Sequence, residues 1–300
     1  MSKASPSNIY PEMVDLNNCD KEPIHLIGRV QSHGVLISGL VDSKRITRCS
    51  LNCDRIFNKN AATLLKSTLS DLLSNSTIEQ LFKELDANNT NFISTKINQL
   101  DVDLIIHLKD EEFILEIEEV ETRVDSLIQQ SKLTKTVSNI NNITNPDTLN
   151  NYLAETIKSH LGYDRVMIYQ FDHQWNGSVV AEKKEDHLES WLGLHYPSTD
   201  IPVPARRLFY NENSRLIKDV NADSIPIVFN SDLVTNKEID LSRSEIRATS
   251  PIHIEYLRNM GVNATLTMPI VSGKIVWGLI GCIITVPNRS TIQSGYRLNF

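Results

Sequence analysis

The stretch WLGLHYPSTDIPVPARRLFY at residues 191–210 places one acidic residue between a rigid turn and a helix start. Pro197 biases Tyr196 toward extended backbone, and the Ser-Thr pair that follows is typical of a turn. Asp200, Ile201 and Pro202 come next, and a helix is expected over residues 203–217 because proline is tolerated in a first helical turn. Such a junction presents fixed backbone groups to a ligand, although alone it also fits an ordinary helix after a loop.

The 300 residues and 34.0 kDa favour two domains, and the net charge of −7 argues against a nucleic-acid partner. The N-terminus lacks the apolar segment of a signal peptide, and the longest apolar run, residues 275–286, is too short to span a bilayer. A cytoplasmic protein with reduced thiols is therefore expected. Cys49 and Cys53 lack a partner cluster for zinc.

The first part of the chain predicts a small α+β domain after a mobile arm at residues 1–18. Strands are expected over residues 44–51, 91–97, 102–108 and 113–120, with a hairpin turn at residues 109–111 and a broken helical region over residues 65–85.

The second part predicts a connecting helix within residues 121–145 and another helix capped by Asn145. A hairpin turn is expected at Asn176-Gly177, and a long irregular segment at residues 219–245. A helix capped by Ser250 and stopped by Gly261 precedes two strands, residues 264–271 and 275–286.

Four motifs together resemble bacteriophytochromes. They are P-S-T-D-I-P-x-x-A-R-x-L-F at residues 197–209, C-D-x-E-P-I-H with Q-x-H-G at residues 19–34, R-A-T-S-P-I-H-x-x-Y-L-x-N-M-G at residues 247–261 and Y-D-R-V-M-x-Y at residues 163–169. The resemblance implies an α+β fold with a PAS domain at 19–125 and a GAF domain at 126–300, built from antiparallel sheets with flanking helices. It also implies a figure-of-eight knot, with the N-terminal arm passing through a GAF loop.

The resemblance implies a bilin chromophore, whose buried pyrrole N–H groups need acceptors. The backbone carbonyl of Asp200 and a water held by His253 are expected to supply them, beside the neighbouring loop residues Ile201 and Pro202. Arginine and hydroxyl groups are expected on the propionates, and apolar and aromatic groups around the outer ring. The propionate residues are Arg215, Arg247, Thr265 and Thr267, and the wall residues are Met167, Tyr169, Tyr196, Phe209 and Tyr256.

The attachment point follows from where the family places its cysteine. Relatives from plants and cyanobacteria carry it directly before the helix histidine, where this chain has Ile252. The matching thiol here is Cys19, which implies biliverdin IXα joined covalently through a vinyl group.

Departures from the family pattern predict altered photochemistry with binding retained. Ile283 stands where the family has a histidine after the strand cysteine, and Phe209 replaces a tyrosine. Leu194 also replaces a common histidine, and Pro269 lies in a strand that is usually free of proline.

The resemblance implies a red/far-red photoreceptor module and not an enzyme. The full-length family members form homodimers and continue into a PHY domain and an output module, often a histidine kinase, so this chain is expected to be a piece of a longer protein. Two alternatives stay open: a PAS-GAF sensor or interaction module without a functional chromophore, and an enzyme with Asp200 and His253 as an acid–base pair.

Overall fold

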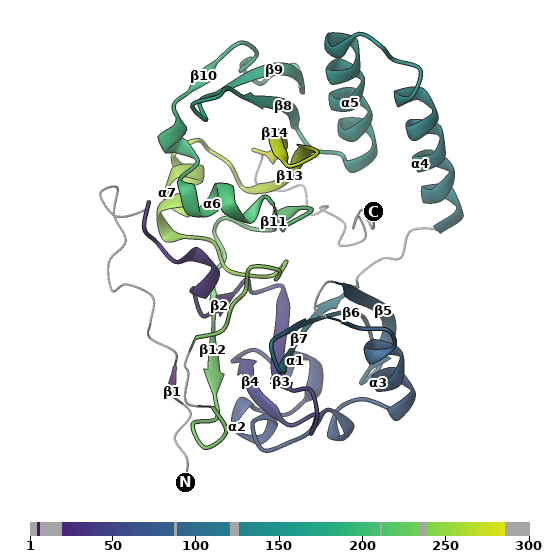
Figure 1. Ribbon diagram of the computed structural model, residues 1–300, viewed down its shortest axis with the longest axis vertical. Helices are drawn as coiled ribbons and strands as arrows, with labels where there is room; N and C mark the ends of the chain where they lie inside the picture. Colours follow the sequence, from purple (N-terminus) through teal and green to yellow (C-terminus); the bar gives the residue numbers. More distant parts are fainter. Residues whose placement is uncertain are drawn as a thin grey trace. The chain divides into compact units, whose positions relative to one another are not determined.

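The computed structural model describes residues 5–6, 20–86, 89–120, 126–210, 212–234 and 238–285. The chain divides into two compact units, and each contains segments that are distant in sequence. Of the described residues, the first unit contains 5–6, 22–121 and 222–251, and the second contains residues 122–221 and the chain from residue 252 onward. Each unit is an antiparallel sheet with helices, which confirms the predicted α+β class (Figure 1).

The first unit is built on one sheet in the order β1-β12-β4-β3-β7-β6-β5, with β2 paired to β12. Its strands are β1 (Ser5–Pro6), β2 (Arg29–Val30), β3 (Gly34–Leu40), β4 (Ile46–Ser50), β5 (Thr90–Ile97), β6 (Leu100–Lys109), β7 (Glu112–Glu119) and β12 (Ile225–Phe229). The helices α1 (Asp54–Phe57), α2 (Ala61–Leu64) and α3 (Asn75–Phe82) are short.

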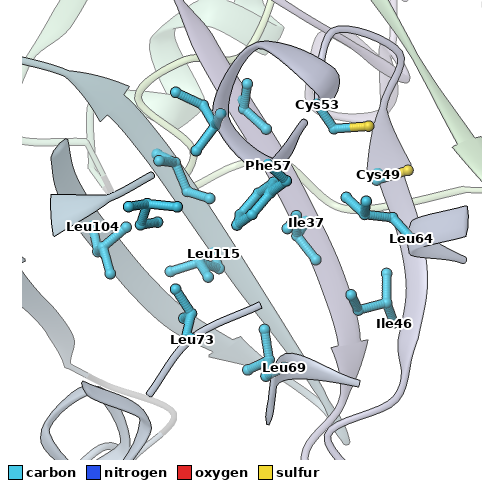
Figure 2. Packing of buried hydrophobic residues seen from close by; sticks show 14 of the residues in the cluster. Ile37, Ile46, Cys49, Cys53, Phe57, Leu64, Leu69, Leu73, Leu104 and Leu115 are labelled. Carbon is cyan, nitrogen blue, oxygen red and sulfur yellow. The ribbon is translucent and has the colours of Figure 1, made fainter. Parts of the chain in front are cut away.

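One face of this sheet forms the main core of the first unit. Alternate residues of the strands, among them Ile37, Leu104 and Leu115, contact side chains from the short helices such as Phe57 and Leu64 (Figure 2). Cys49 and Cys53 are fully buried in the same cluster, as expected for packing thiols. The predicted hairpin between residues 102–108 and 113–120 is confirmed by the pairing of β6 with β7.

The broken helical region predicted over residues 65–85 is confirmed in part, because a 3-10 turn (Leu69–Asp71) and α3 form there with non-helical residues between them. Ser74 caps α3 by accepting a hydrogen bond from the Thr77 amide, so the helix starts late. The irregular segment predicted at 219–245 is also partly wrong. It contains β12, which pairs with β2 and β4 from far away in the sequence.

The second unit is built on a sheet in the order β10-β9-β8-β14-β13-β11. Its strands are β8 (Arg165–Phe171), β9 (Gly177–Lys184), β10 (His195–Tyr196), β11 (Arg215–Ile217), β13 (Ala264–Ser272) and β14 (Ile275–Ile284). Its helices are α4 (Ser126–Ile140), α5 (Pro146–Leu161), α6 (Val203–Leu208) and α7 (Pro251–Asn259). Figure 1 shows α5 on one side of this sheet and α6 and α7 on the other.

Local signals account for most boundaries in the second unit. The Asn145 side chain accepts from the Thr148 amide at the start of α5, as predicted, and Gly162 ends the helix with φ +71°. The helix predicted over 203–217 is too long, since α6 stops at Leu208 and Arg215–Ile217 pairs with β13 as β11. The predicted hairpin is confirmed by the pairing of β8 with β9, but its turn spans residues 172–176 instead of lying at Asn176-Gly177, because the Asp172 amide donates to the Asn176 carbonyl.

Candidate functional site

The two faces of the second sheet have different chemistry. Cross-strand pairs share a face, and successive residues alternate between faces. Val166, Ile168 and Cys282 therefore share the face that packs against Ala154 and Leu161 of α5 in an apolar core. The opposite face carries polar and aromatic side chains, and we call it the open face.

Hydroxyl groups and a guanidinium align on the open face. Thr267 lies opposite Arg215 of β11, and Thr265 lies opposite both Ile217 and Ile283. Thr265 and Thr267 thus share one face, as their alternation predicts. Arg215 and Thr267 are half-buried, so part of each remains accessible.

The predicted wall residues gather on this same face. Tyr169 is buried and packs with Met167, Tyr196, Ile201 and Phe209 in one cluster. The rings of Tyr169 and Tyr196 are 5.9 Å apart at a tilt of 45°. Met167 also contacts the adjoining cluster around Ile283 and α7. The structure therefore brings together residues from β8, from β10, from the loop before α6 and from the C-terminal end of α6.

Asp200 and Tyr256 form the polar part of this region. The Tyr256 hydroxyl donates to Asp200 Oδ2 at 3.5 Å. Burial raises the pKa of Asp200, which the Tyr256 hydrogen bond opposes. Burial and the Asp200 charge raise the pKa of Tyr256 to about 12, so the phenol remains protonated at neutral pH. Pro202, half-buried, adopts φ −65° as the cap residue of α6 and fixes the chain just after Asp200.

His253 stacks on Tyr256, with ring centroids 6.2 Å apart and an interplanar angle of 18°. Desolvation, together with the charge of Arg215, lowers the pKa of His253 to about 4. The side chain nevertheless keeps an exposed surface. It is therefore a neutral imidazole at neutral pH, with ring nitrogens able to donate and accept hydrogen bonds. Among the described residues, no hydrogen bond joins it to Asp200.

Three other predicted residues occupy different places. Ile252 is half-buried on α7. Arg247 belongs to the first unit, is 3% exposed, and donates from Nη1 to the Ile24 carbonyl at 3.5 Å. Cys19 lies outside the described residues.

A buried ion pair on the open face was missed by the sequence analysis. Arg165, 2% exposed, pairs with Glu182 and lies 3.7 Å from the Trp191 ring. Its Nη2 also donates to the Glu189 carbonyl at 2.6 Å, and Glu182 accepts from Ser190 Oγ at 2.6 Å. Strand alternation places Arg165 on the same face as Met167, and a charge there requires a buried partner, which was the available signal.

The donor set suits a long conjugated ligand that carries ring N–H groups and carboxylates. The open face offers aromatic surfaces, a neutral imidazole, an acidic loop, the Arg215 guanidinium and the hydroxyl groups of Thr265 and Thr267. Among the described residues, no group of three or more histidine, cysteine or acidic side chains could hold a metal ion. None of the helices in the described ranges has the length and apolar composition needed to cross a bilayer.

Comparisons with known proteins agree with this geometry. A family model described as PAS fold matches residues 19–120, and one described as GAF domain matches residues 145–293. The chain is 37% identical over 282 residues to cyanobacterial phytochrome B from a Nostoc species, covering 91% of this chain and 37% of that protein. It is 34% identical over 290 residues to the bacteriophytochrome of Pseudomonas aeruginosa, covering 93% of this chain and 39% of that protein. The chain therefore spans less than half of the length of these relatives.

Solved structures extend the agreement to three dimensions. The chromophore-binding domain of Stigmatella aurantiaca phytochrome P1 superposes with a TM-score of 0.83 at 30% identity, covering 93% of each chain. A threonine-to-histidine variant of the chromophore-binding domain of the bacteriophytochrome from the same organism gives a TM-score of 0.81 at 31% identity, covering 94% of this chain and 92% of that one. These matches confirm the predicted order of a PAS domain followed by a GAF domain, and the chain belongs to the phytochrome family.

Proposed function

We propose that this chain is a red/far-red light-sensing module that binds biliverdin IXα on the open face of its GAF sheet. The observation that carries the proposal is the gathering of Tyr169, Tyr196, Asp200, His253 and Tyr256 around that face. Family membership and the solved chromophore-binding domains support the same conclusion.

Different residues would bind the ring N–H groups and the propionates of the bilin. The Asp200 carbonyl and a water held by neutral His253 would accept hydrogen bonds from ring N–H groups, which are costly to bury unpaired. Guanidinium and hydroxyl groups would hold the propionates. Those groups belong to Arg215, Arg247, Thr265 and Thr267, while Ile201 and Pro202 keep the acidic loop rigid.

Cys19 would attach the chromophore, because Ile252 has no thiol at the alternative position. The sulfur would form a bond to one vinyl carbon of the first ring as the vinyl double bond is lost, and the thiol proton would end on carbon. No oxidant or reductant is needed. When bound, a bilin supplies absorption of red light and a double bond that isomerises.

Ile283 is the residue on which altered photochemistry is proposed to depend. Its side chain is 5% exposed and packs with Ile217, Leu257 and Met167. It offers no hydrogen bond where the family has a histidine. The same feature favours the second candidate function, a PAS-GAF sensor or interaction module without a working chromophore.

Properties of a longer protein remain proposals. We propose a cytoplasmic protein that forms a homodimer and continues into PHY and output modules, with no catalytic role for the PAS and GAF domains. The domain limits 19–125 and 126–300 and the figure-of-eight knot also stay predictions.

The test is to mix the purified chain with biliverdin and record absorption. A red-shifted band that survives denaturation as zinc-enhanced fluorescence is expected. The Cys19→Ser variant should retain the band and lose the covalent signal, because binding and attachment use different groups. If the chain and the variant both stay colourless, the module without a chromophore is the better description.

A further inference from the structure

A side chain from the turn between β8 and β9 holds the start of the loop that carries Asp200. The Ser198 amide donates to Asn176 Oδ1 at 3.1 Å, although the two residues are 22 positions apart in the chain. Ser198 opens a 3-10 turn (Ser198–Asp200), whose last amide donates to the Pro197 carbonyl at 3.1 Å. Asn176 thus binds the first amide of the turn that presents the Asp200 carbonyl.

A proline explains why this amide needs a partner from another part of the chain. β10 pairs with β9 so that Tyr196 lies opposite Gly177. The next pair in this register would join Pro197 to Asn176, but proline has no N–H to continue the ladder. Pro197 also has no side-chain acceptor for the first amide of the 3-10 turn that follows it. The Asn176 side chain supplies this acceptor.

The Asn176 side chain is itself held in place by Asp172. Its Nδ2 donates to Asp172 Oδ2 at 3.0 Å. Asp172 Oδ1 accepts from the amides of Gln174 and Asn176, at 2.7 and 2.9 Å. The side-chain hydrogen bond from Asn176 is the first of the effects that lower the pKa of Asp172, so the carboxylate is ionised at neutral pH. Because the carboxamide is bonded at both ends, it has little freedom to turn away from Ser198.

The same turn also contacts the helix that follows the acidic loop. Trp175 has φ +66°, a left-handed conformation that is rare for a bulky side chain. Its ring centroid lies 5.1 Å from that of Phe171 and 5.1 Å from Arg206 Cζ in α6. A residue keeps such a conformation only where the surrounding contacts outweigh the strain. The turn therefore contacts the chain on both sides of Asp200, at Ser198 and at Arg206.

We propose that Asn176 is a positioning residue that aims the Asp200 carbonyl at the ring nitrogens of the bilin. The inference rests on the proposed function, in which that carbonyl accepts a hydrogen bond from a ring N–H. A carbonyl in this role stabilises the protonated ring nitrogen relative to the deprotonated one. Hydrogen bonds weaken steeply with misalignment, so a 3-10 turn that has lost the Asn176 contact should hold the ring proton less firmly.

The experiment measures the acidity of the bound bilin. The full chain is saturated with biliverdin, and its red absorption band is titrated between about pH 6 and pH 10, because loss of a ring proton alters the conjugated system. Asn176→Ala should lower the midpoint by about one pH unit, a tenfold increase in acidity. A side chain that only stabilised the fold would lower the free energy of unfolding and leave the midpoint unchanged. Without biliverdin, the same variant should speed hydrogen exchange at the Ser198 amide.

Ser198→Pro removes the other partner of the same hydrogen bond. The backbone accommodates proline there, because a 3-10 turn has φ of about −60° and Pro197 before it is already extended, with ψ 156°. This variant should lower the midpoint as Asn176→Ala does. The double variant should go no lower than either single variant, because both changes act on one interaction. Gln174→Ala, at an exposed position in the same turn, should leave the midpoint unchanged.

Exchanging two side chains of the turn tests the same geometry by rescue. In the double variant Asp172→Asn/Asn176→Asp, an amide at position 172 can donate to a carboxylate at position 176, which still accepts from the Ser198 amide. Each hydrogen bond of the turn then keeps a donor and an acceptor. The midpoint should therefore return at least to its value in the parent chain.

The outcomes separate this inference from the proposed function. A coloured chain whose midpoint is unchanged in Asn176→Ala or in Ser198→Pro would overturn the inference alone, as would additive shifts or an exchange that restores nothing. If Asn176→Ala does not fold, Ser198→Pro and the exchange decide the matter. A parent chain that stays colourless with biliverdin would overturn the proposed function, and the inference with it.

Discussion

The PAS and GAF sheets each bury one apolar face, but their second faces are covered to different extents. On the PAS sheet, Glu116 and His107 are 0% and 1% exposed, and the chain's own residues 239–248 cover them. On the GAF sheet, Met167, Arg215 and Thr267 remain half-buried. A buried polar group requires a partner, and Glu116 finds its partners in the amides of Glu245 and Ile246 of the same chain. The open face of the GAF sheet is the one suited to a ligand.

The largest expected effect is on the covered PAS face. Leu36→Ala removes a fully buried side chain and should lower the free energy of unfolding by about 2–5 kcal/mol. Because no ligand contacts this face, the loss of unfolding free energy should be the same with and without biliverdin. Urea unfolding measures both values. Leu51→Ala, at an exposed position in the same unit, should change stability by less than about 0.5 kcal/mol.

A bilin-dependent loss for Leu36→Ala would contradict the comparison, because it would mean that the ligand also completes the PAS face.

The second effect is a loss of folding stability at acidic pH. Burial lowers the pKa of His107 from 6.5 to about 4, so the unfolded chain takes up a proton as pH falls below 6.5 while the folded chain does not. Stability is therefore lost between those two values, by about 2 kcal/mol at pH 5 relative to pH 7.5. His107→Gln should remove this share of the pH dependence in urea unfolding, whereas exposed His187→Gln should not.

Identical pH dependence in the parent chain and His107→Gln would show that the imidazole is not the group that titrates.

A third, smaller effect distinguishes the two faces of β14. Ile283→His places a polar group at a buried position that borders half-buried Met167, and should cost about 1 kcal/mol without chromophore. With biliverdin it should enlarge the red/far-red difference spectrum, because the imidazole can bond the ligand. Ile284→His, on the α5 face, should cost more stability and leave the spectrum unchanged.

Comparable difference spectra for the parent chain and Ile283→His would count against the role proposed for position 283.

The contrast between the sheets explains what the sequence could predict. Alternation alone put Thr265 and Thr267 on one face, and capping residues located the start of α5, because both signals are local. The motif at residues 197–209 correctly marked a loop and helix start at the open face. Residues 203–217 show the limit, since Arg215–Ile217 becomes a strand only by pairing with β13.

Nonlocal pairing also explains why the sequence analysis missed β12 and the partners of two buried charges. The run IPIVF contains a proline and lies in a polar segment, so nothing nearby identifies β12. The strand forms because it pairs with β2 and β4, which lie almost two hundred residues earlier in the chain. The partners of Glu116 and Arg165 could not be predicted for the same reason. A charged residue at a buried position indicates that a partner is needed, but the sequence does not show which distant residue supplies it.

The smallest effect without ligand is expected at Met167, which touches both clusters of the open face while remaining half-buried. Met167→Ala should lower the free energy of unfolding by less than about 1 kcal/mol in the free chain, because the side chain is already partly solvated. With biliverdin present, the loss of unfolding free energy should be about 1 kcal/mol larger. The reason is that a variant that binds biliverdin fivefold more weakly is stabilised less by it. Val166→Ala, buried on the opposite face, should cost the same in both states. Thermal unfolding with and without biliverdin separates these cases, and a ligand-independent loss at Met167 would place the bilin elsewhere.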